Sequence, residues 1–462
     1  MAIATVNPAT GETLKTYDEI SDAEVERCLA AAVKAHASYR LTDFGARAAW
    51  MRRAAGILDD EAGQIAAMMT TEMGKTLAAA RQEVAKCANA CRFYADCAQE
   101  FLADEPADAE AVGADRAYVT YQSIGPVLAI MPWNFPLWQA MRFAAPALMA
   151  GNVGLLKHAS NVPQTALFMQ DLFARAGFPE GTFQTLLVGS ARVEAILRDD
   201  RVAAATLTGS GPAGQSVAAI AGSEVKKVVL ELGGSDPFIV MPSAGLEAAA
   251  RVGAVARCLN NGQSCIAAKR FIVHEAVYDD FERLFTGQMS GKTVGDPMLE
   301  STDVGPLASE QQRKDVEELV ADAVGKGARV LCGGTAPAGP GWYYPPTVLA
   351  GITDAMRVHR EEVFGPVATI YRVADIDEAI ELANGTEFGL GANAWTDDEE
   401  ERARFVRDLA AGMVFINGNV TSYPQLPFGG VKNSGHGREL AAAGIREFAN
   451  IKSVWMGSSQ QS

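Results

Sequence analysis

The strongest constraint on the fold is a regular alternation of short apolar runs with helical patterns from residue 153 onward. Short apolar runs bounded by turn residues are typical of buried strands, and the segments between them repeat apolar residues at helical spacing. The predicted order is strand 153–157, helix 164–176, strand 183–188, helix 191–198, strand 202–208, helix 213–221 and strand 226–231. Strands separated by helices in this way indicate a parallel sheet covered by helices, so we predict an α/β fold.

The alternation resumes after Pro242 and continues to Gly412, which predicts a second α/β unit. A length of 462 residues fits about three domains. We predict two Rossmann-like domains with parallel or mixed sheets, and a small β element. The predicted ranges are 1–104 with 124–232 for the first domain, 233–444 for the second, and 105–123 with 445–458 for the β element.

The N-terminal region predicts a strand pair followed by helices. Turn signals at Asn7-Pro8 and Thr10-Gly11 fall within the first 20 residues. Helical spacing covers 21–40 and 44–101, and Ser21 with Glu24 has the form of a capping box. Residues 104–115 read as an acidic loop, 116–123 and 451–456 alternate like strands, and the terminal SSQQS is expected to fray.

Composition excludes several classes of protein. The formal net charge of −16 argues against nucleic acid or an anionic membrane as a partner. The most apolar region, 125–156, is interrupted by prolines and by Arg142, which argues against a membrane helix. The seven cysteines have no paired framework and no secretory signal precedes them, so we expect reduced thiols and a cytoplasmic protein. The five histidines lack metal-ligand spacing, so we expect no metal.

A glycine-rich segment between a predicted strand and helix suggests a dinucleotide site. Residues 209–214 have the pattern Gly-x-Gly-x-x-Gly, which lets the backbone approach a pyrophosphate at a helix N-terminus. Glu231 ends the next strand, where an ordinary Rossmann domain holds its ribose-binding acid. The pattern alone also fits a simple glycine-rich turn.

Cys265 is the candidate nucleophile. It follows a predicted helix and the turn Asn260-Asn261-Gly262, and it precedes a strand. A thiol on a loop held by rigid elements can attack a substrate, although most isolated cysteines are buried apolar groups.

Several segments gain meaning when they are taken together. They are PWNFP at 132–136, LLKHAS at 155–160, LTGSGPAG at 207–214, LELGG at 230–234, NNGQSC at 260–265, EEVFGP at 361–366 and PFGGVKNSGHGREL at 427–440. In this order they resemble the aldehyde dehydrogenase superfamily along essentially the whole chain. The resemblance implies NAD(P)-dependent oxidation of an aldehyde to a carboxylic acid. It also implies a cofactor domain, a catalytic domain and a strand element that joins subunits into a homodimer or homotetramer.

The resemblance assigns three catalytic residues. Cys265 matches the nucleophile that forms a thiohemiacetal and then a thioester. Asn134 matches the amide that holds the developing oxyanion, together with the backbone N–H of Cys265. Glu231 matches the base that activates water, which replaces the ribose role suggested by the bare glycine pattern. Because Glu231 favours water as the acceptor of the acyl group, an enzyme that transfers the acyl group to coenzyme A is the weaker alternative.

The resemblance also assigns cofactor-binding residues. Glu362 and Phe364 match contacts to the nicotinamide and its ribose, while Trp133, Gly209 and Ser210 match pocket and pyrophosphate contacts. Lys157 matches the lysine at the adenosine ribose.

The cofactor preference depends on one further position. NAD-preferring relatives usually carry Glu where this chain has Ser160. A carboxylate would repel a 2′-phosphate, whereas a serine can donate to it. We therefore expect NADP as the cofactor, with NAD as a weaker alternative.

The substrate residues point to a semialdehyde. Arg142 stands where relatives that oxidise succinate semialdehyde carry Arg, and a guanidinium can grip a carboxylate with two hydrogen bonds. Ser422 matches a serine that assists there, and Phe428 lies in the adjoining PFGG segment. Arg142 could instead form a structural ion pair. Two departures stand out: Leu259 replaces a second substrate Arg, and Ala267 replaces a cysteine that forms a redox switch, so we expect no such disulfide.

The sequence thus predicts an NADP-dependent oxidation of succinate semialdehyde to succinate. The alternatives are a dehydrogenase for aliphatic or aromatic aldehydes and a non-catalytic binding or structural relative. A cysteine hydrolase would leave the glycine loop and Lys157 unexplained.

Overall fold

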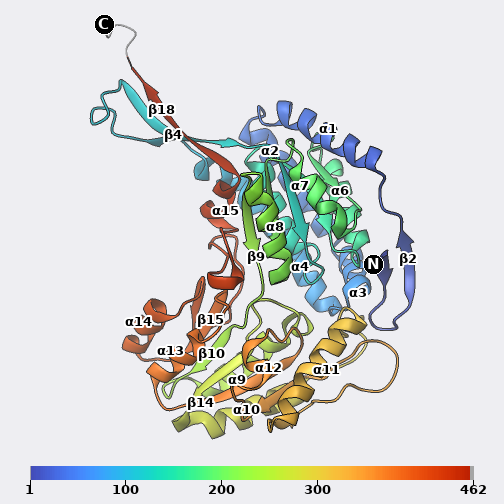
Figure 1. The fold of residues 1–462 in the computed structure, drawn as a ribbon, viewed down its shortest axis with the longest axis vertical. Coiled ribbons are helices and arrows are strands. Elements are labelled where there is room, and N and C mark those ends of the chain that lie inside the picture. Colours follow the sequence, from blue (N-terminus) through green and yellow to red (C-terminus); the bar gives the residue numbers. More distant parts are fainter. Residues whose placement is uncertain (1, 458–462) are drawn as a thin grey trace.

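The computed structural model describes residues 2–457 and contains two α/β units with a projecting arm (Figure 1). The N-terminal segment forms the predicted strand pair, and the predicted capping box at Ser21 and Glu24 is confirmed. The first elements are β1 (Ile3–Val6), β2 (Thr13–Tyr17), α1 (Asp22–Tyr39), α2 (Phe44–Asp60), α3 (Ala62–Met73) and α4 (Leu77–Phe101). No helix in the described range is both long and apolar enough to cross a membrane.

The first unit is built on a six-stranded sheet with the order β17-β9-β8-β5-β6-β7. All neighbours are parallel except β17, as the alternating pattern predicted. Its strands are β5 (Pro126–Met131), β6 (Val153–His158), β7 (Phe183–Thr185), β8 (Ala204–Thr208), β9 (Lys227–Glu231) and β17 (Gly435–His436). The connecting helices are α5 (Trp138–Met149), α6 (Pro163–Arg175), η1 (Ser190–Arg192), α7 (Val193–Arg198) and α8 (Gly211–Ser223).

The second unit is built on a seven-stranded sheet with the order β12-β13-β14-β11-β10-β15-β16, parallel except for β12. Its strands are β10 (Pro237–Val240), β11 (Arg270–His274), β12 (Arg329–Cys332), β13 (Thr347–Ala350), β14 (Val367–Val373), β15 (Gly391–Trp395) and β16 (Met413–Ile416). Its helices are α9 (Leu246–Cys258), η2 (Leu259–Gly262), η3 (Glu275–Val277), α10 (Tyr278–Ser290), α11 (Glu310–Gly325), α12 (Arg357–Arg360), α13 (Ile376–Asn384) and α14 (Glu399–Asp408).

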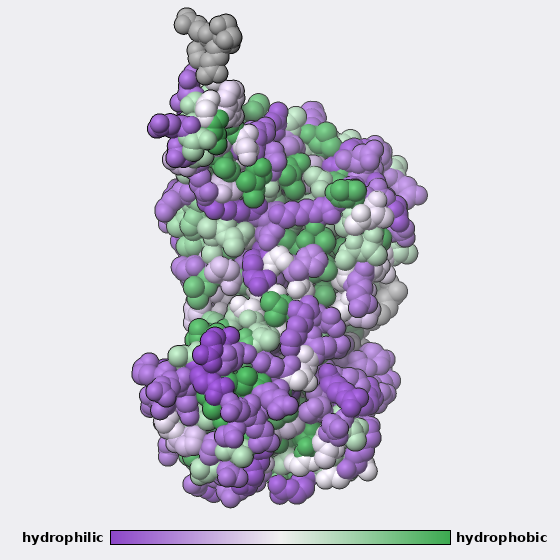
Figure 2. Space-filling view, turned by 60° about the vertical axis from the view of Figure 1, so that its left-hand side comes forward, coloured by the Kyte–Doolittle hydropathy of each residue, from purple (hydrophilic) through white to green (hydrophobic). Residues whose placement is uncertain are grey.

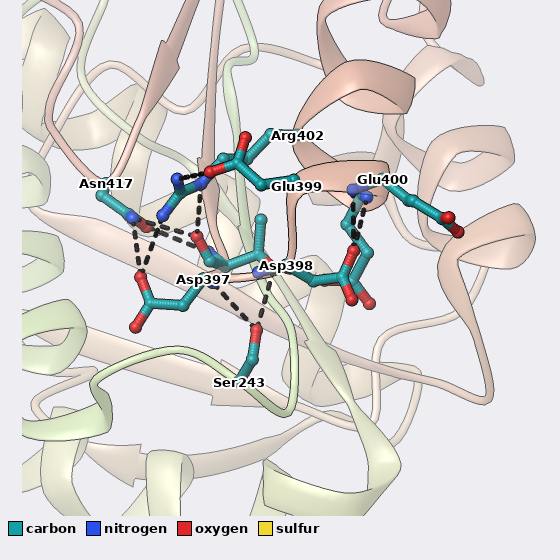
Figure 3. Close-up of polar contacts among 9 residues, drawn as sticks. Ser243, Asp397, Asp398, Glu399, Glu400, Arg402 and Asn417 are labelled. Carbon is teal, nitrogen blue, oxygen red and sulfur yellow. Dashed lines mark hydrogen bonds and ion pairs between the residues drawn. The ribbon is translucent and has the colours of Figure 1, made fainter.

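Polar side chains join the loops at the carboxyl edge of the second sheet (Figure 3). The Ser243 hydroxyl accepts a hydrogen bond from the Asp397 backbone N–H at 2.9 Å. Asp398 caps α14 by accepting from the backbone N–H groups of Glu400 and Glu401. Capping satisfies donors that a helix start leaves unpaired, so this edge is held by side chains as well as by strands.

The last part of the second predicted range lies with the first unit. η4 (Lys432–Ser434) leads into β17, which pairs with β9, and α15 (Ala441–Glu447) packs on α4 and α5. Leu440 and Ile445 are buried in the same apolar core as the strands of the first sheet. Residues 435–444 therefore belong to the first unit, whereas the predicted range 233–444 assigned them to the second domain. The reason is that their apolar side chains complete the first core.

A three-stranded sheet of β3 (Glu105–Pro106), β4 (Arg116–Ser123) and β18 (Ala449–Met456) forms the arm. β4 and β18 are antiparallel, with Arg116 opposite Met456 and Ser123 opposite Ala449. β3, β4 and β18 fall within the ranges 105–123 and 445–458 that the prediction gave to a β element, of which Ser458 lies outside the described residues. The arm extends away from both units (Figure 1), and hydrophobic residues are visible on it among hydrophilic ones (Figure 2).

Candidate active site

Two cavities meet at Cys265. The first has a volume of about 400 Å³ and the second about 250 Å³, and Gln139 and Cys265 line both. The first cavity lies at the carboxyl ends of β5, β8 and β9, because these parallel strands end at one edge of the sheet. A thiol at such a junction can be reached from two sides, by two different molecules.

The loop that carries Cys265 has an unusual backbone. Asn260, Asn261 and Gly262 follow α9 with φ values of 55°, 59° and 77°, all in the left-handed region. Asn and Gly tolerate this region better than other residues, which explains the Asn-Asn-Gly sequence. The Asn261 side chain donates to the carbonyl oxygens of Gly74 and Pro306, so the turn is fixed by long-range contacts.

Lys269 holds the cysteine loop from behind. Its ammonium group donates to the carbonyl oxygens of Ser264 (3.0 Å) and Cys265 (2.8 Å), and it forms an ion pair with Glu362 at 3.1 Å. Lys269 thereby connects the predicted nucleophile to a predicted cofactor residue. Sequence reasoning missed it, because a lysine at the start of a strand gives no signal by itself.

The surroundings of Cys265 keep its thiol protonated at rest. The side chain is partly exposed to the cavities, yet desolvation by the surrounding protein raises the pKa of the Cys265 thiol to about 12. The positive charges of Arg142 and Lys269 act in the opposite direction and lower this pKa. The thiol is therefore neutral near pH 7, and a thiolate requires a further change in its surroundings.

Asn134 faces the same cavity with one amide hydrogen available. The side chain is buried, and its Nδ2 donates to the carbonyl oxygen of Gln263 at 3.1 Å. An amide NH₂ has two donors, so the second can serve a ligand near Cys265. The backbone carbonyl of Asn134 accepts from the Asn260 side chain at 2.7 Å, which ties its loop to the cysteine loop.

Glu231 is not brought into the lining of either cavity. It ends β9 with its side chain buried, and a β-carbon on Gly429 would lie 2.6 Å from its Oε1. Burial and the negative charge of Glu439 raise the pKa of the Glu231 carboxyl well above its usual range, while Arg142 and Arg438 lower it less. These surroundings favour the protonated, neutral form of the Glu231 carboxyl.

Most predicted cofactor residues line the first cavity: Trp133, Gly209, Ser210, Glu362 and Phe364. The rings of Trp133 and Phe364 lie edge to face at 5.7 Å between centroids. Ser210 precedes α8, makes no side-chain capping bond, and is followed by a helix that has Pro at its start. Unpaired N–H groups and the positive end of a helix suit a pyrophosphate. The residues present therefore fit a dinucleotide.

Lys157 and Ser160 lie beyond this lining, on the neighbouring strand. Lys157 belongs to β6, and burial lowers the pKa of its ammonium group. Ser160 follows β6, is partly exposed, and accepts from the Ala4 backbone N–H through its carbonyl oxygen. Since β5 and β6 are parallel neighbours, both residues lie at the edge of the sheet that carries the first cavity.

The predicted substrate residues Arg142, Ser422 and Phe428 all line the second cavity. The Arg142 guanidinium lies 4.2 Å from the centre of the Phe428 ring, and its Nε pairs with Glu439. The cavity contact and the alternative ion pair therefore occur together. Lys86 and Gln139 also line this cavity and were missed by sequence reasoning. The one signal for Lys86 is its place on α4 beside a largely apolar buried face, which also contains Glu83.

The aldehyde dehydrogenase family matches residues 1–454 of the sequence. The chain belongs to the aldehyde dehydrogenase family. A succinate-semialdehyde dehydrogenase [NADP(+)] 1 of Mycobacterium tuberculosis is 63% identical over 456 residues, which cover 99% of this chain and 100% of the relative. The corresponding enzyme of Mycobacterium avium is 63% identical over 461 residues, or 100% of this chain and 98% of the relative.

Solved structures of related dehydrogenases also align with this dehydrogenase over 99% of its chain. A succinic semialdehyde dehydrogenase of Streptococcus pyogenes in complex with NADP+ aligns with a TM-score of 0.96 and 38% identity, covering 99% of this chain and 100% of that one. A succinate-semialdehyde dehydrogenase of Burkholderia pseudomallei aligns with a TM-score of 0.95 and 37% identity, covering 99% and 95%. The predicted fold class is therefore confirmed.

Replacement of Gly262 tests whether the left-handed turn sets the position of the thiol. In Gly262→Ala a β-carbon would overlap the backbone of Gly365 and Pro366, next to Glu362 and Phe364. We expect a lower Tm and at least about 2 kcal/mol of lost stability, with loss of dehydrogenase activity. Calorimetry measures the first effect. The control is Gly287→Ala in α10, where the β-carbon meets nothing within 4 Å. It should leave the Tm unchanged or higher, and an unchanged Tm in Gly262→Ala would contradict the interpretation.

The protonation state of Cys265 can be measured by alkylation. With a pKa of about 12, the thiolate fraction of the cofactor-free dehydrogenase should rise about tenfold per pH unit between pH 7 and 10. Iodoacetamide labelling of the Cys265 peptide, followed by mass spectrometry, should show this slope. Cys97, whose pKa is also raised by burial but near the surface, is the internal reference and should level off first. A plateau for Cys265 below pH 9 would show a preformed thiolate instead.

Proposed function

We propose that this dehydrogenase oxidises succinate semialdehyde to succinate with NADP. The observation that carries the proposal is the position of Cys265 between two cavities of different character. One is lined by the glycine loop and the helix start of α8, and the other contains the cations Lys86 and Arg142. Relatives that are 63% identical along the whole chain bear this activity in their names.

The chain's own residues would hold the cofactor as follows. Gly209 and Ser210 would receive the pyrophosphate at the start of α8, and Glu362 would accept from the nicotinamide ribose with Lys269 fixing it. Trp133 and Phe364 would flank the ring. When bound, the nicotinamide supplies the acceptor for the hydride of the aldehyde carbon. Ser160 in place of a carboxylate leaves room and a donor for a 2′-phosphate, beside the charge of Lys157.

Cys265 is the proposed nucleophile. Its thiolate attacks the aldehyde carbon, and the oxygen that becomes negative is held by the free N–H of Asn134 and the backbone N–H of Cys265. Donors that are already in place where charge develops contribute about 3–4 kcal/mol each. Arg142 and Lys269 favour the thiolate electrostatically, since both lower the pKa of Cys265.

Glu231 is proposed to accept the proton of the water that hydrolyses the thioester. Its neighbours Leu232 and Gly233 line the first cavity, so rotation of the side chain would deliver the carboxyl group there. To act as a base it must first lose its own proton, because its resting pKa is raised. Movement out of the buried site towards the cavity restores solvation and lowers that pKa.

We also propose that the arm joins subunits into a homodimer or homotetramer. Ile451 and Trp455 of β18 are 61% and 54% exposed, although both are large and apolar. A projecting apolar strand of this kind is typical of an interface. The free state of all seven cysteines favours a reducing compartment, and we place the enzyme in the cytoplasm.

A paired substitution in the arm tests the subunit interface. The double variant Ile451→Lys, Trp455→Lys should dissociate the oligomer, because two buried charges per subunit would replace apolar contacts. Light scattering after gel filtration gives the molecular mass. Leu41→Lys replaces an apolar residue that is 74% exposed on the first unit and should leave the mass unchanged. An arm variant with the same mass as the original protein would rule out this interface.

Steady-state kinetics test the proposed reaction. We expect kcat/KM for succinate semialdehyde to exceed that for butanal, a neutral aldehyde of equal length, by about 10- to 100-fold, because charge-assisted hydrogen bonds hold the carboxylate. NADP should be preferred to NAD. Equal rates with the two aldehydes would favour the alternative of an enzyme for neutral aldehydes. The absence of cofactor reduction with any aldehyde would favour a non-catalytic relative or a hydrolase.

Ser160→Glu tests the origin of the cofactor preference. At about 4 Å and an intermediate dielectric, two negative charges repel by a few kcal/mol, so use of NADP should fall by about 100-fold while use of NAD is retained. The ratio of kcat/KM values with the two cofactors measures this. Ser223→Glu adds the same charge at an exposed serine of α8 and should not change the ratio. A ratio unchanged in Ser160→Glu would exclude this position from cofactor discrimination.

A further inference from the structure

Lys86 is a cation in the lining of the second cavity, and none of the roles assigned so far involves it. It lies on α4, half-buried, and lines the cavity together with Cys265, Arg142 and Leu259. Its ammonium group is 4.4 Å from the centre of the Trp138 ring and donates to the Ser422 hydroxyl at 2.5 Å. Within residues 2–457 it takes part in no ion pair.

Two carboxylates, one near Lys86 on α4 and one beside Arg142, are already engaged. Glu83, one turn earlier on α4, pairs with Lys75 through Oε2 and accepts the backbone N–H groups of Leu137 and Trp138 through Oε1. Glu439 pairs with Arg142. The charge of Lys86 is therefore the uncompensated one at this wall of the cavity, and such a charge favours an anionic ligand.

Lys86 also determines what the Ser422 hydroxyl can do. The Ser422 oxygen accepts from Lys86 Nζ and, at 3.0 Å, from the Trp138 indole N–H. A hydroxyl oxygen has two acceptor sites and one proton. With both acceptor sites filled, Ser422 can only donate, and its proton is directed away from the two donors. An ammonium group and a hydroxyl donor side by side match the two oxygens of a carboxylate.

We propose that Lys86 binds the distal carboxylate of the substrate, with Ser422 as its partner donor, and so sets the preference for carboxylated over neutral aldehydes. This inference rests on the proposed function. Arg142 has its Nε committed to Glu439 and its face on Phe428, which leaves only its Nη groups to reach the substrate. Leu259, which stands in place of a second substrate arginine, lines the same cavity. Lys86 restores the missing cation from α4.

Titration of Lys86 supplies a further readout. Burial, and then the positive charge of Arg142, lower the pKa of Lys86 to about 8; Cys87 and Glu83 raise it, and Lys75 lowers it. A group with a lowered pKa loses its positive charge as the pH rises through that value. KM for succinate semialdehyde should therefore increase between pH 7 and 9, whereas KM for butanal should not follow.

The test is Lys86→Met, measured with succinate semialdehyde and with butanal. Methionine keeps most of the length of the side chain but removes the charge and the donor. We expect kcat/KM for succinate semialdehyde to fall by about 10- to 100-fold, mainly through KM. The value for butanal should change little, and the rise of KM above pH 8 should disappear. Lys86→Arg keeps a cation and should retain most of the preference. Arg92→Met removes an exposed cation of the same helix, paired with Asp59, and should have no effect.

The outcomes separate the two proposals. If the unmodified enzyme shows no preference for succinate semialdehyde over butanal, the proposed function fails. If it shows the preference and Lys86→Met keeps it with the same pH dependence, the inference about Lys86 fails and the function stands. Equal losses with both aldehydes, together with a lower Tm in Lys86→Met and Lys86→Arg, would assign Lys86 a structural role and also overturn the inference.

Discussion

The active site depends on hydrogen bonds that cross between the two sheets and hold the cysteine loop against the first unit. The Asn260 side chain, which belongs to the second unit, donates to the carbonyl oxygen of Asn134, and Asn261 reaches Gly74 in the same way. These contacts require the left-handed backbone of the turn. Without them the thiol would belong to one unit and the helix start of α8 to the other. With them the two cavities meet at one sulfur atom.

The electrostatics of the second cavity follow from what is buried there. Lys75 and Arg142 are each paired with a carboxylate and Lys86 is not, while burial and Glu439 favour the neutral form of Glu231. The cavity therefore carries an excess of positive charge. In the proposed reaction this charge stabilises negative charge at two places. One charge is the carboxylate that the substrate brings, and the other develops on the sulfur and then on the oxygen during attack. An ionised Glu231 would oppose both, since its negative charge raises the pKa of Cys265.

The sequence predicted the elements and the residues with a strong local pattern. The alternation of strands and helices, the capping box at Ser21 and the strand character of β4 all reflect spacing along the chain, which needs no knowledge of distant contacts. The glycine loop and Cys265 were found because their segments resemble those of a family. Lys86 and Lys269 were missed because their roles come from side chains far away in the chain. The predicted range 233–444 for the second domain extended too far for the same reason, since β17 pairs with β9, a strand some two hundred residues earlier.

The surroundings that favour the neutral form of Glu231 also bear on how the proposed reaction ends. Oxidation converts a ligand with one negative charge into a product with two. Lys86, Ser422 and Arg142 can contact only the first of these negative charges, because all three line the second cavity, beyond the thiol. The second carboxylate forms at Cys265, where Asn134 offers a neutral donor. If Glu231 takes the proton of the attacking water, it becomes neutral again as this carboxylate forms. Glu231 and the new carboxylate then do not face each other as two negative charges. The product is also bound less tightly at its new carboxylate than at the carboxylate that the substrate brought. The same arrangement that activates the thiol thus favours release of the acid.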